Sequence, residues 1–318
     1  MATLPPAPLK RLSRPQVPPG FRITERDIAI LNAVARFRFL TSEQIARLIG
    51  GSAPAISVRL KLLFYHAYLD RPRHQHAQLA MFFDEGNRPL VYGLARHGAR
   101  VLSELGLAVD AKIDWTLKNA RATSNFLAHT IETAEAMIAI DRDCRTLDAV
   151  RLIDHHELLP YMPEKTRRLR DPFRCRVEVR VKELSAPLTI GVVPDRLFSL
   201  AFDNGTRHNF ALELDRGTMD IAAKKLAGKS SFRRKLLGYF HAWRERRHTE
   251  AWGFQSFRVL TLTPSEKRIE NMIAAQRVIT NNAAAGLFLY ATPDRLAVNG
   301  ALGDAWVNGA GQPVRLLA

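Results

Sequence analysis

This sequence has few cysteines, and it lacks both long apolar runs and a nucleotide-binding loop. Its 318 residues include two cysteines, Cys144 and Cys175, with no CxxC pair, which favours two reduced thiols over a disulfide framework. No run of 18 apolar residues occurs, and the first residues lack an apolar signal core, so we expect a cytoplasmic protein with no membrane partner. The segment Gly228-Lys229-Ser230 lacks the upstream glycine of a phosphate-binding loop, which argues against ATP-driven chemistry.

Acidic residues are few compared with basic ones. The chain has 47 Lys and Arg residues against 31 Asp and Glu residues, a formal net charge of +16. Such an excess favours a polyanion as partner over an acidic small molecule. Charge alone does not separate nucleic acid from an anionic membrane surface, so the pattern of elements has to decide.

Residues 1–22 differ from the rest of the chain. Six prolines stand among Lys10, Arg11 and Arg14, a composition too rich in proline to pack, and we expect a disordered tail or a basic arm on DNA. The remaining chain is long enough, and at 47% hydrophobic residues apolar enough, for two cores. We expect the boundary between them near residues 106–114.

Residues 23–108 carry the signals of three short helices. Thr24 is an N-cap candidate ahead of apolar residues at helical spacing that continue to Phe39. Thr41, or the serine after it, precedes a glutamate and a glutamine in the pattern of a capping box. Ser52 caps a third helix that has a proline in its first turn.

Two strands and a basic connection follow the third helix. We expect the strands at residues 68–71 and 90–94, with Arg73 and Arg88 in the connection and a closing helix at 95–105. Helices followed by a hairpin are typical of a winged helix-turn-helix, so double-stranded DNA is the first partner to consider. Positive charge in the connection would contact the DNA backbone or minor groove and add affinity without sequence information.

The outward side of the third helix is the expected recognition surface. Ser57, Arg59 and Lys61 lie there, where they can reach phosphates or the acceptor edge of guanine in the major groove. A solvated helix face is the alternative interpretation. The histidines nearby, at positions 66, 74 and 76, have neither a cysteine nor helical ligand spacing, so we do not expect a metal site there.

Residues 115–318 alternate helices and strands, which predicts an α/β domain with a central mixed sheet and an α+β fold overall. The expected elements are a helix at 125–140, strands at 189–193, 197–202 and 209–215, a helix at 221–246, a strand at 257–262, a helix at 265–279 and a strand at 287–290.

Three carboxylates fall on these strands. Asp195 opens the second strand, and the period of two places Glu213 and Asp215 on one face of the third. Carboxylates on one face repel, and Mg²⁺ held by one or two of them would relieve this repulsion and suit phosphodiester chemistry. In the alternative, Asp195 caps a turn and the other two lie on a solvated face.

These residues resemble the core of the PD-(D/E)XK nucleases. The resemblance implies that Asp195 and Glu213 hold Mg²⁺ and that Asp215 supports a second ion or positions water. The strand that should read Glu-x-Lys reads Glu-x-Asp, so the lysine that polarises water in that family is missing. Lys235 on the next helix is the first candidate for a substitute that stabilises charge on the phosphate, and it is equally suited to bind phosphate.

The predicted helix at 221–246 is strongly basic, with Glu245 as its only acid. Such a helix faces either a polyanion or open water. Four of its cations are the expected DNA contacts: Lys224, Lys225, Arg233 and Arg234.

The two halves together are similar to the replication-relaxation family of plasmid and mobile-element proteins. The resemblance extends over residues 23–245 and runs through Arg26–Leu31, Phe39–Ile45, Val91–Leu94 with Gly98-Ala99, Leu127–Thr130 and Glu213–Gly217. It implies DNA binding linked to replication or mobilisation of an element, with replication or mobilisation proteins as further partners.

Several functions stay open. The leading one is a DNA-binding protein that acts in replication or mobilisation, or in its regulation, with an inactive nuclease-like domain. A Mg²⁺-dependent endonuclease with a relocated lysine is the alternative, and an adaptor that uses the winged helix without DNA is a third class. Covalent nicking through tyrosine is not expected, because the chain lacks a His-hydrophobe-His pattern. A homodimer stays open as well, although no heptad run would supply its interface.

Overall fold

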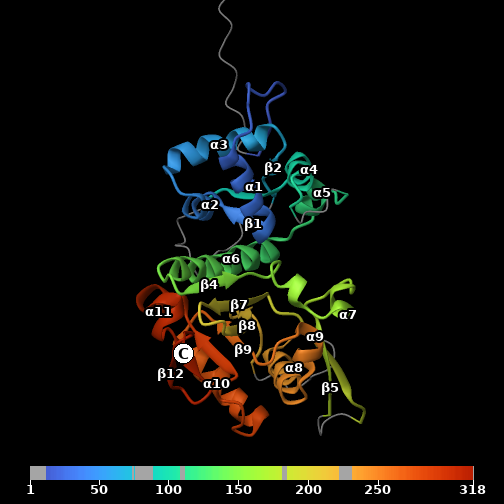
Figure 1. The fold of residues 1–318 in the computed structure, drawn as a ribbon, viewed down its shortest axis with the longest axis vertical. Coiled ribbons are helices and arrows are strands. Elements are labelled where there is room, and N and C mark those ends of the chain that lie inside the picture. The colour runs from blue at the N-terminus through green and yellow to red at the C-terminus, as the bar shows by residue number, and fades with distance from the viewer. Residues whose placement is uncertain are drawn as a thin grey trace, which may run out of the picture. The chain divides into compact units, whose positions relative to one another are not determined.

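The structure is a computed structural model that describes residues 12–73, 75, 89–107, 112–180, 185–221 and 231–317. Its contacts divide the chain into two units, unit 1 up to Glu135 and unit 2 from Ala136 onward (Figure 1). The division falls inside α6 (Ser124–Arg145), later in the chain than residues 106–114. The reason is that α5 (Trp115–Ala120) and the first half of α6 pack with unit 1.

Unit 1 places its helices around a small antiparallel sheet. Its strands pair in the order β1, β3, β2. Phe39, which we expected in the first helix, lies in β1, because Arg38 takes a positive φ of 72° and ends the helix before it. The elements are α1 (Glu25–Phe37), β1 (Phe39–Thr41), α2 (Ser42–Ile49), α3 (Ala53–Tyr65), β2 (Leu69–Asp70), β3 (Val91–Leu94) and α4 (Arg96–Glu104).

Local side-chain caps begin the first three helices at the predicted residues. Thr24 and Asp27 form a capping box at α1, and Thr41 and Gln44 form one at α2. The Ser52 hydroxyl accepts a backbone N–H at the start of α3. Each of these side chains pairs with a backbone group that the helix itself leaves without a partner, which fixes where the helix starts.

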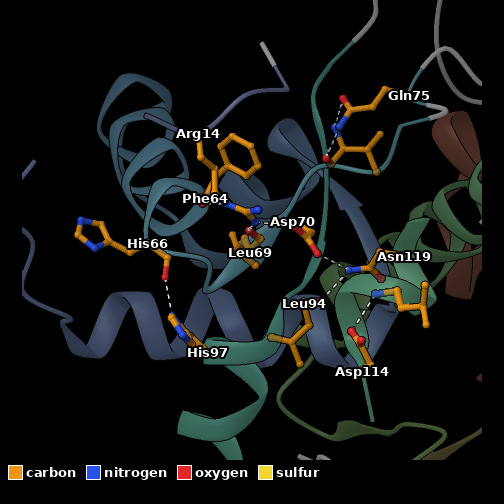
Figure 2. A network of polar contacts seen from close by, with 12 residues as sticks. Arg14, Phe64, His66, Leu69, Asp70, Gln75, Leu94, His97, Asp114 and Asn119 are labelled. Carbon is orange, nitrogen blue, oxygen red and sulfur yellow. Dashed lines mark hydrogen bonds and ion pairs between the residues drawn. The ribbon is translucent and has the colours of Figure 1, made fainter. Parts of the chain in front are cut away.

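The described part of the N-terminal segment, residues 12–22, lies against unit 1. Arg14 donates from Nε to the carbonyl oxygen of Phe64 (2.7 Å) and from Nη2 to that of Leu69 (3.1 Å). It also forms an ion pair with Asp70 at 2.5 Å (Figure 2). Phe64 lies in the last turn of α3 and Leu69 and Asp70 form β2, so Arg14 fastens the segment to both elements.

A seven-stranded mixed sheet forms the centre of unit 2, in the order β12, β11, β10, β9, β8, β7, β4. β8, β9 and β10 run parallel to each other, and the remaining pairs are antiparallel. The fold is therefore α+β, as predicted. The strands are β4 (Val150–Ile153), β7 (Arg196–Phe202), β8 (Arg207–Leu214), β9 (Arg258–Leu262), β10 (Phe288–Ala291), β11 (Trp306–Asn308) and β12 (Pro313–Val314).

Helices α8 (Phe232–Arg244) and α10 (Glu266–Thr280) connect the parallel strands and pack against each other. The predicted strand at 189–193 is β6 (Leu188–Val192), which pairs with β5 (Cys175–Val179) in a separate hairpin against α8 rather than joining the main sheet. Of the predicted helix 221–246, residues 222–230 lie outside the described residues. The remaining elements are α7 (Glu164–Arg167), α9 (Arg247–Trp252), α11 (Pro293–Asn299) and two short helical turns, Leu159–Tyr161 and Gly300–Asp304.

Every described helix is too short or too polar to span a bilayer.

Candidate functional site

Glu213 is held at both carboxylate oxygens by side chains of α8. Lys235 donates from Nζ to Oε2 and forms an ion pair there, and the hydroxyl of Tyr239 donates to Oε1. Lys235 and Tyr239 are four residues apart, which places them on one side of the helix. The Glu213 side chain is only 5% exposed. The carboxylate therefore lies in a packed interior, and the alternative of a solvated sheet face is wrong for this residue.

The electrostatics of this cluster follow from its burial. Burial raises the pKa of Glu213 to about 7, against the opposing charge of Lys235 and with a smaller contribution from Asp195. For Lys235, burial alone would lower the pKa, but the charges of Glu213 and Asp195 raise it above its usual value. Burial also raises the pKa of Tyr239 well above 10. Lys235 thus stays a cation and Tyr239 a hydroxyl donor, and neither is available as a base.

Asp215 has a different set of partners, although it shares a predicted face with Glu213. Arg268 of α10 donates from Nη2 to Oδ1 at 2.9 Å and from Nε to Oδ2, and the Thr263 hydroxyl donates to Oδ2 at 2.8 Å. Arg268 also reaches the carbonyl oxygen of Met219 at 2.6 Å. A two-pronged guanidinium contact is among the strongest that a carboxylate forms, so Asp215 is neutralised in place. Sequence reasoning missed Arg268, because no local pattern links it to Asp215.

Asp195 connects two strands. Its Oδ2 accepts the backbone N–H of Leu214 at 2.8 Å, which ties the start of β7 to the end of β8. This contact accounts for its place near Glu213, whose pKa it raises. The three predicted carboxylates are thus close along the strands, but each has its own protein partners.

The space among these side chains is small. A cavity of about 10 Å³ is lined by Glu213, Asp215, Lys235 and Tyr239, among others, and this is room for about one water. Within the described ranges, no three His, Cys, Asp or Glu side chains form a group that could hold a metal ion. Mg²⁺ needs near-octahedral oxygen ligands, whereas both oxygens of Glu213 already accept hydrogen bonds from other side chains. The residues as placed do not fit a Mg²⁺ site.

The second candidate region is the surface of α3 in unit 1. Ile56 and Leu60 are buried against the rest of the unit. Ser57, Val58 and Lys61 are exposed, and Val58 is 58% exposed. The helix therefore has a packed side and a free side that mixes a hydroxyl, a methyl pair and a cation.

Arg59, which we expected at the DNA interface, is bound within unit 1. Its Nε donates to Oδ1 of Asp27 at 2.9 Å, and its Nη2 donates to Oδ2 of Asp27 and to the carbonyl oxygen of Arg22 at 2.9 Å. The guanidinium also lies over the ring of Phe21, 4.7 Å from its centre. Burial would raise the pKa of Asp27, but hydrogen bonds from Arg59 and Thr24 lower it overall. Arg59 thus joins α3 to α1 and to the segment before it.

The other predicted DNA contacts are spread over both units. Arg73 is exposed just after β2. Arg233 and Arg234 lie half-buried in the first turn of α8, and Arg234 donates to the carbonyl oxygen of Thr189 at 3.2 Å. Three predicted contacts lie outside the described residues: Arg88, Lys224 and Lys225.

Comparison with known proteins gives one family. A family model described as replication-relaxation matches residues 31–256, which is more than half of the chain. The matched range includes α3 as well as the Glu213 cluster. No curated protein and no solved structure matches the chain.

Proposed function

The chain belongs to the replication-relaxation family, and we propose that it is a DNA-binding protein that acts in the replication or mobilisation of a plasmid or mobile element, or in its regulation. The free side of α3 carries this proposal. Duplex DNA is the main partner in it, replication or mobilisation proteins are further partners, and the protein works in the cytoplasm. A homodimer would present two α3 surfaces to one DNA.

Several features of unit 1 support a winged helix that uses α3 for recognition. Three capped helices precede the pair β2 and β3, and α3 has its apolar side buried and its polar side free. On the free side, Ser57 can bond a phosphate or base edge, Val58 can contact a thymine methyl group, and Lys61 can reach a phosphate or guanine. Arg73 follows β2, where a wing would add contact with the backbone.

DNA binding by Lys61→Ala tests this proposal. The matched control is Lys267→Ala, which removes one exposed lysine from α10 in unit 2. We expect Lys61→Ala to lose roughly 1–3 kcal/mol of affinity if Lys61 contacts a base, or to reduce the salt slope by about one if it contacts a phosphate. Lys267→Ala should change neither. A flat salt dependence of the intact protein, or equal effects of both substitutions, would contradict the proposal.

For unit 2 we propose a nuclease-like domain without catalysis. The support is that Lys235 and Tyr239 occupy both oxygens of Glu213 while Arg268 and Thr263 occupy Asp215. The cluster then serves to hold α8 against β8. The alternative, a Mg²⁺-dependent endonuclease, is favoured by one observation, which is that Lys235 does reach the carboxylate of Glu213.

A plasmid assay separates the two possibilities. Purified protein is incubated with supercoiled plasmid and Mg²⁺ or Mn²⁺, in parallel with Glu213→Ala. We expect no nicked or linear product, together with retained, salt-sensitive DNA binding. Cleavage by the intact chain that disappears in Glu213→Ala would replace the proposal with the endonuclease.

A further inference from the structure

Unit 2 has an open basic cleft whose lining shares no residue with the Glu213 cluster. The cleft has a volume of about 1120 Å³. It is formed by α7, the connection from α7 to β5, β5 itself and α9, which Figure 1 shows on one side of the unit. Five cations line it, and they come from all four of these segments: Lys165, Arg170, Arg174, Arg176 and Arg247.

Only part of this positive charge is balanced. Two carboxylates line the cleft, and each pairs with one arginine. Asp171 bonds Arg174 at 2.9 Å, and Glu250 bonds Arg247 at 2.8 Å. The three cations that remain are exposed, and their side chains form no hydrogen bond or ion pair with any residue that the structure describes: Lys165, Arg170 and Arg176. Five cations against two carboxylates leave the lining with a net charge of +3.

The β5–β6 hairpin brings two of the arginines together. Arg176 is exposed on a strand whose alternate residues are buried, and its partner across the hairpin is Gly191. A Cβ at Gly191 would lie 3.0 Å from Nη1 of Arg174, so the missing side chain leaves the room in which Arg174 lies across the hairpin. The hairpin thus adds the unbalanced charge of Arg176 beside an arginine that Asp171 already neutralises.

The shape and chemistry of the cleft indicate the class of ligand. Its volume exceeds the roughly 300–1,000 Å³ of small-molecule sites, which favours an extended ligand. Arginine presents a planar fork of donors that matches phosphate oxygens. None of the residues described in the lining is aromatic, so bases have nothing to stack on. The lining therefore suits a chain of phosphates rather than unpaired bases or a single small anion.

We propose that the cleft formed by α7, β5 and α9 binds the phosphodiester backbone of DNA without sequence preference, as a contact separate from α3. This inference rests on the proposed DNA-binding function. It assigns unit 2 a role in affinity that does not depend on the Glu213 cluster.

The test is a triple substitution in the full chain, Lys165→Ala, Arg170→Ala and Arg176→Ala. Affinity for a duplex of arbitrary sequence is measured by fluorescence anisotropy over a series of NaCl concentrations. Three lost phosphate contacts should reduce the slope of log Kd against log salt by about 2 to 3, with at least a tenfold weaker Kd at low salt. All three residues are exposed, and far-UV circular dichroism checks that the variant folds.

The control removes the same charge elsewhere in unit 2. Arg145→Ala, Lys267→Ala and Arg315→Ala delete three exposed cations, each of which pairs with a carboxylate outside the cleft. This triple should leave the slope within about one of the original. An equal fall in both triples would overturn the inference, because net charge rather than the cleft would then govern binding.

The outcomes also separate the inference from the proposed function. If Lys61→Ala weakens binding and the cleft triple does not, the cleft is not a DNA contact and the proposed function stands. If the intact chain shows no salt-sensitive DNA binding, the proposed function fails and the inference fails with it. A loss in the cleft triple that appears with single-stranded DNA but not with duplex also overturns it, because the cleft lacks a stacking surface.

Discussion

Lys61 in unit 1 and Lys235 in unit 2 lie on helices of equal length but in very different surroundings. Each lies on a 13-residue helix, and the sequence presents both as ligands for phosphate. Lys61 remains exposed beside Tyr65, whereas Lys235 pairs with the buried Glu213. A cation is available to an external anion only if the fold gives it no carboxylate of its own, and the helix sequence alone does not reveal which case applies.

Polar pairs in this chain are either local or distant in the sequence, and unit 1 has both kinds, since Arg59 binds Asp27 32 residues away. In unit 1 the caps at Thr24 and Thr41 join residues three apart. In unit 2 Glu213 pairs with Lys235, 22 residues away in the sequence, and Asp215 pairs with Arg268, 53 residues away. Local pairs set the ends of helices, while the distant pairs fix the sheet and its helices in one arrangement.

The largest effect is expected when the ion pair of unit 2 is broken. Glu213→Gln leaves Lys235 without its counter-charge in a largely buried site, and we expect a loss of about 3 kcal/mol in the free energy of unfolding. Urea unfolding followed by circular dichroism measures this. Glu213→Gln combined with Lys235→Met should recover part of the loss, because the unpaired cation is then gone.

The sign of this change also tests the comparison between the units. Carboxylates kept for catalysis often cost stability, so their removal tends to stabilise a protein. If Glu213→Gln raised the free energy of unfolding, the cluster in unit 2 would be a functional centre rather than a structural one. Tyr239→Phe provides a milder version, since it removes only one hydrogen bond to Glu213.

A smaller effect distinguishes two neighbouring cations of α3. Arg59→Ala leaves the fully buried Asp27 without its guanidinium, and we expect a loss of about 2 kcal/mol in stability. Lys61→Ala should stay within about 0.5 kcal/mol of the native chain, because it touches no carboxylate. Thermal unfolding of both variants measures the difference. Equal stability of the two would mean that the Arg59 contacts contribute little.

The smallest expected effect is the change in the free energy of unfolding for each pH unit of acidification. Burial lowers the pKa of His155 to about 3, and its Nδ1 accepts the backbone N–H of Leu197 at 3.1 Å. Below pH 6.5 the unfolded chain binds a proton that the folded chain does not. The contribution of His155 to the free energy of unfolding should therefore fall by about 1.4 kcal/mol per pH unit from 6.5 towards 3 and stay level above 6.5. Glu213, whose pKa burial raises from 4.5 to about 7, contributes the opposite slope between those two values, so the His155 contribution is read as the difference between the native chain and a His155 variant.

His155→Phe is the variant that checks this pH dependence. It retains an aromatic ring against Phe173, on which His155 stacks at 3.6 Å. The variant is expected to be less stable at neutral pH, because the N–H of Leu197 loses its acceptor, but its stability relative to the native chain should improve as the pH falls below 6.5. A stability difference between the two proteins that does not change with pH would contradict the role of His155.

Much of the fold could be predicted from residues close together in the sequence. Local sequence patterns predict the caps at Thr24, Thr41 and Ser52 and the order of helices and strands. This is possible because these features depend on residues within one or two turns of each other. The short strand β1 was missed because three residues after a helix look like its continuation. The place of β6 in a separate hairpin was missed as well, because strand pairing is a long-range choice.

By itself, the sequence determined the family, the α+β class, the helix starts and the candidate residues, since charge, capping and periodicity are properties of the chain. Only the tertiary structure decided which candidates are free. In the folded chain, Arg59 pairs with Asp27, Lys235 with Glu213 and Arg268 with Asp215. The cations of the cleft come from four separate segments that packing brings together. The physical reason is that an ion pair or a shared surface depends on distances in space, and these are set by packing between segments far apart in the chain.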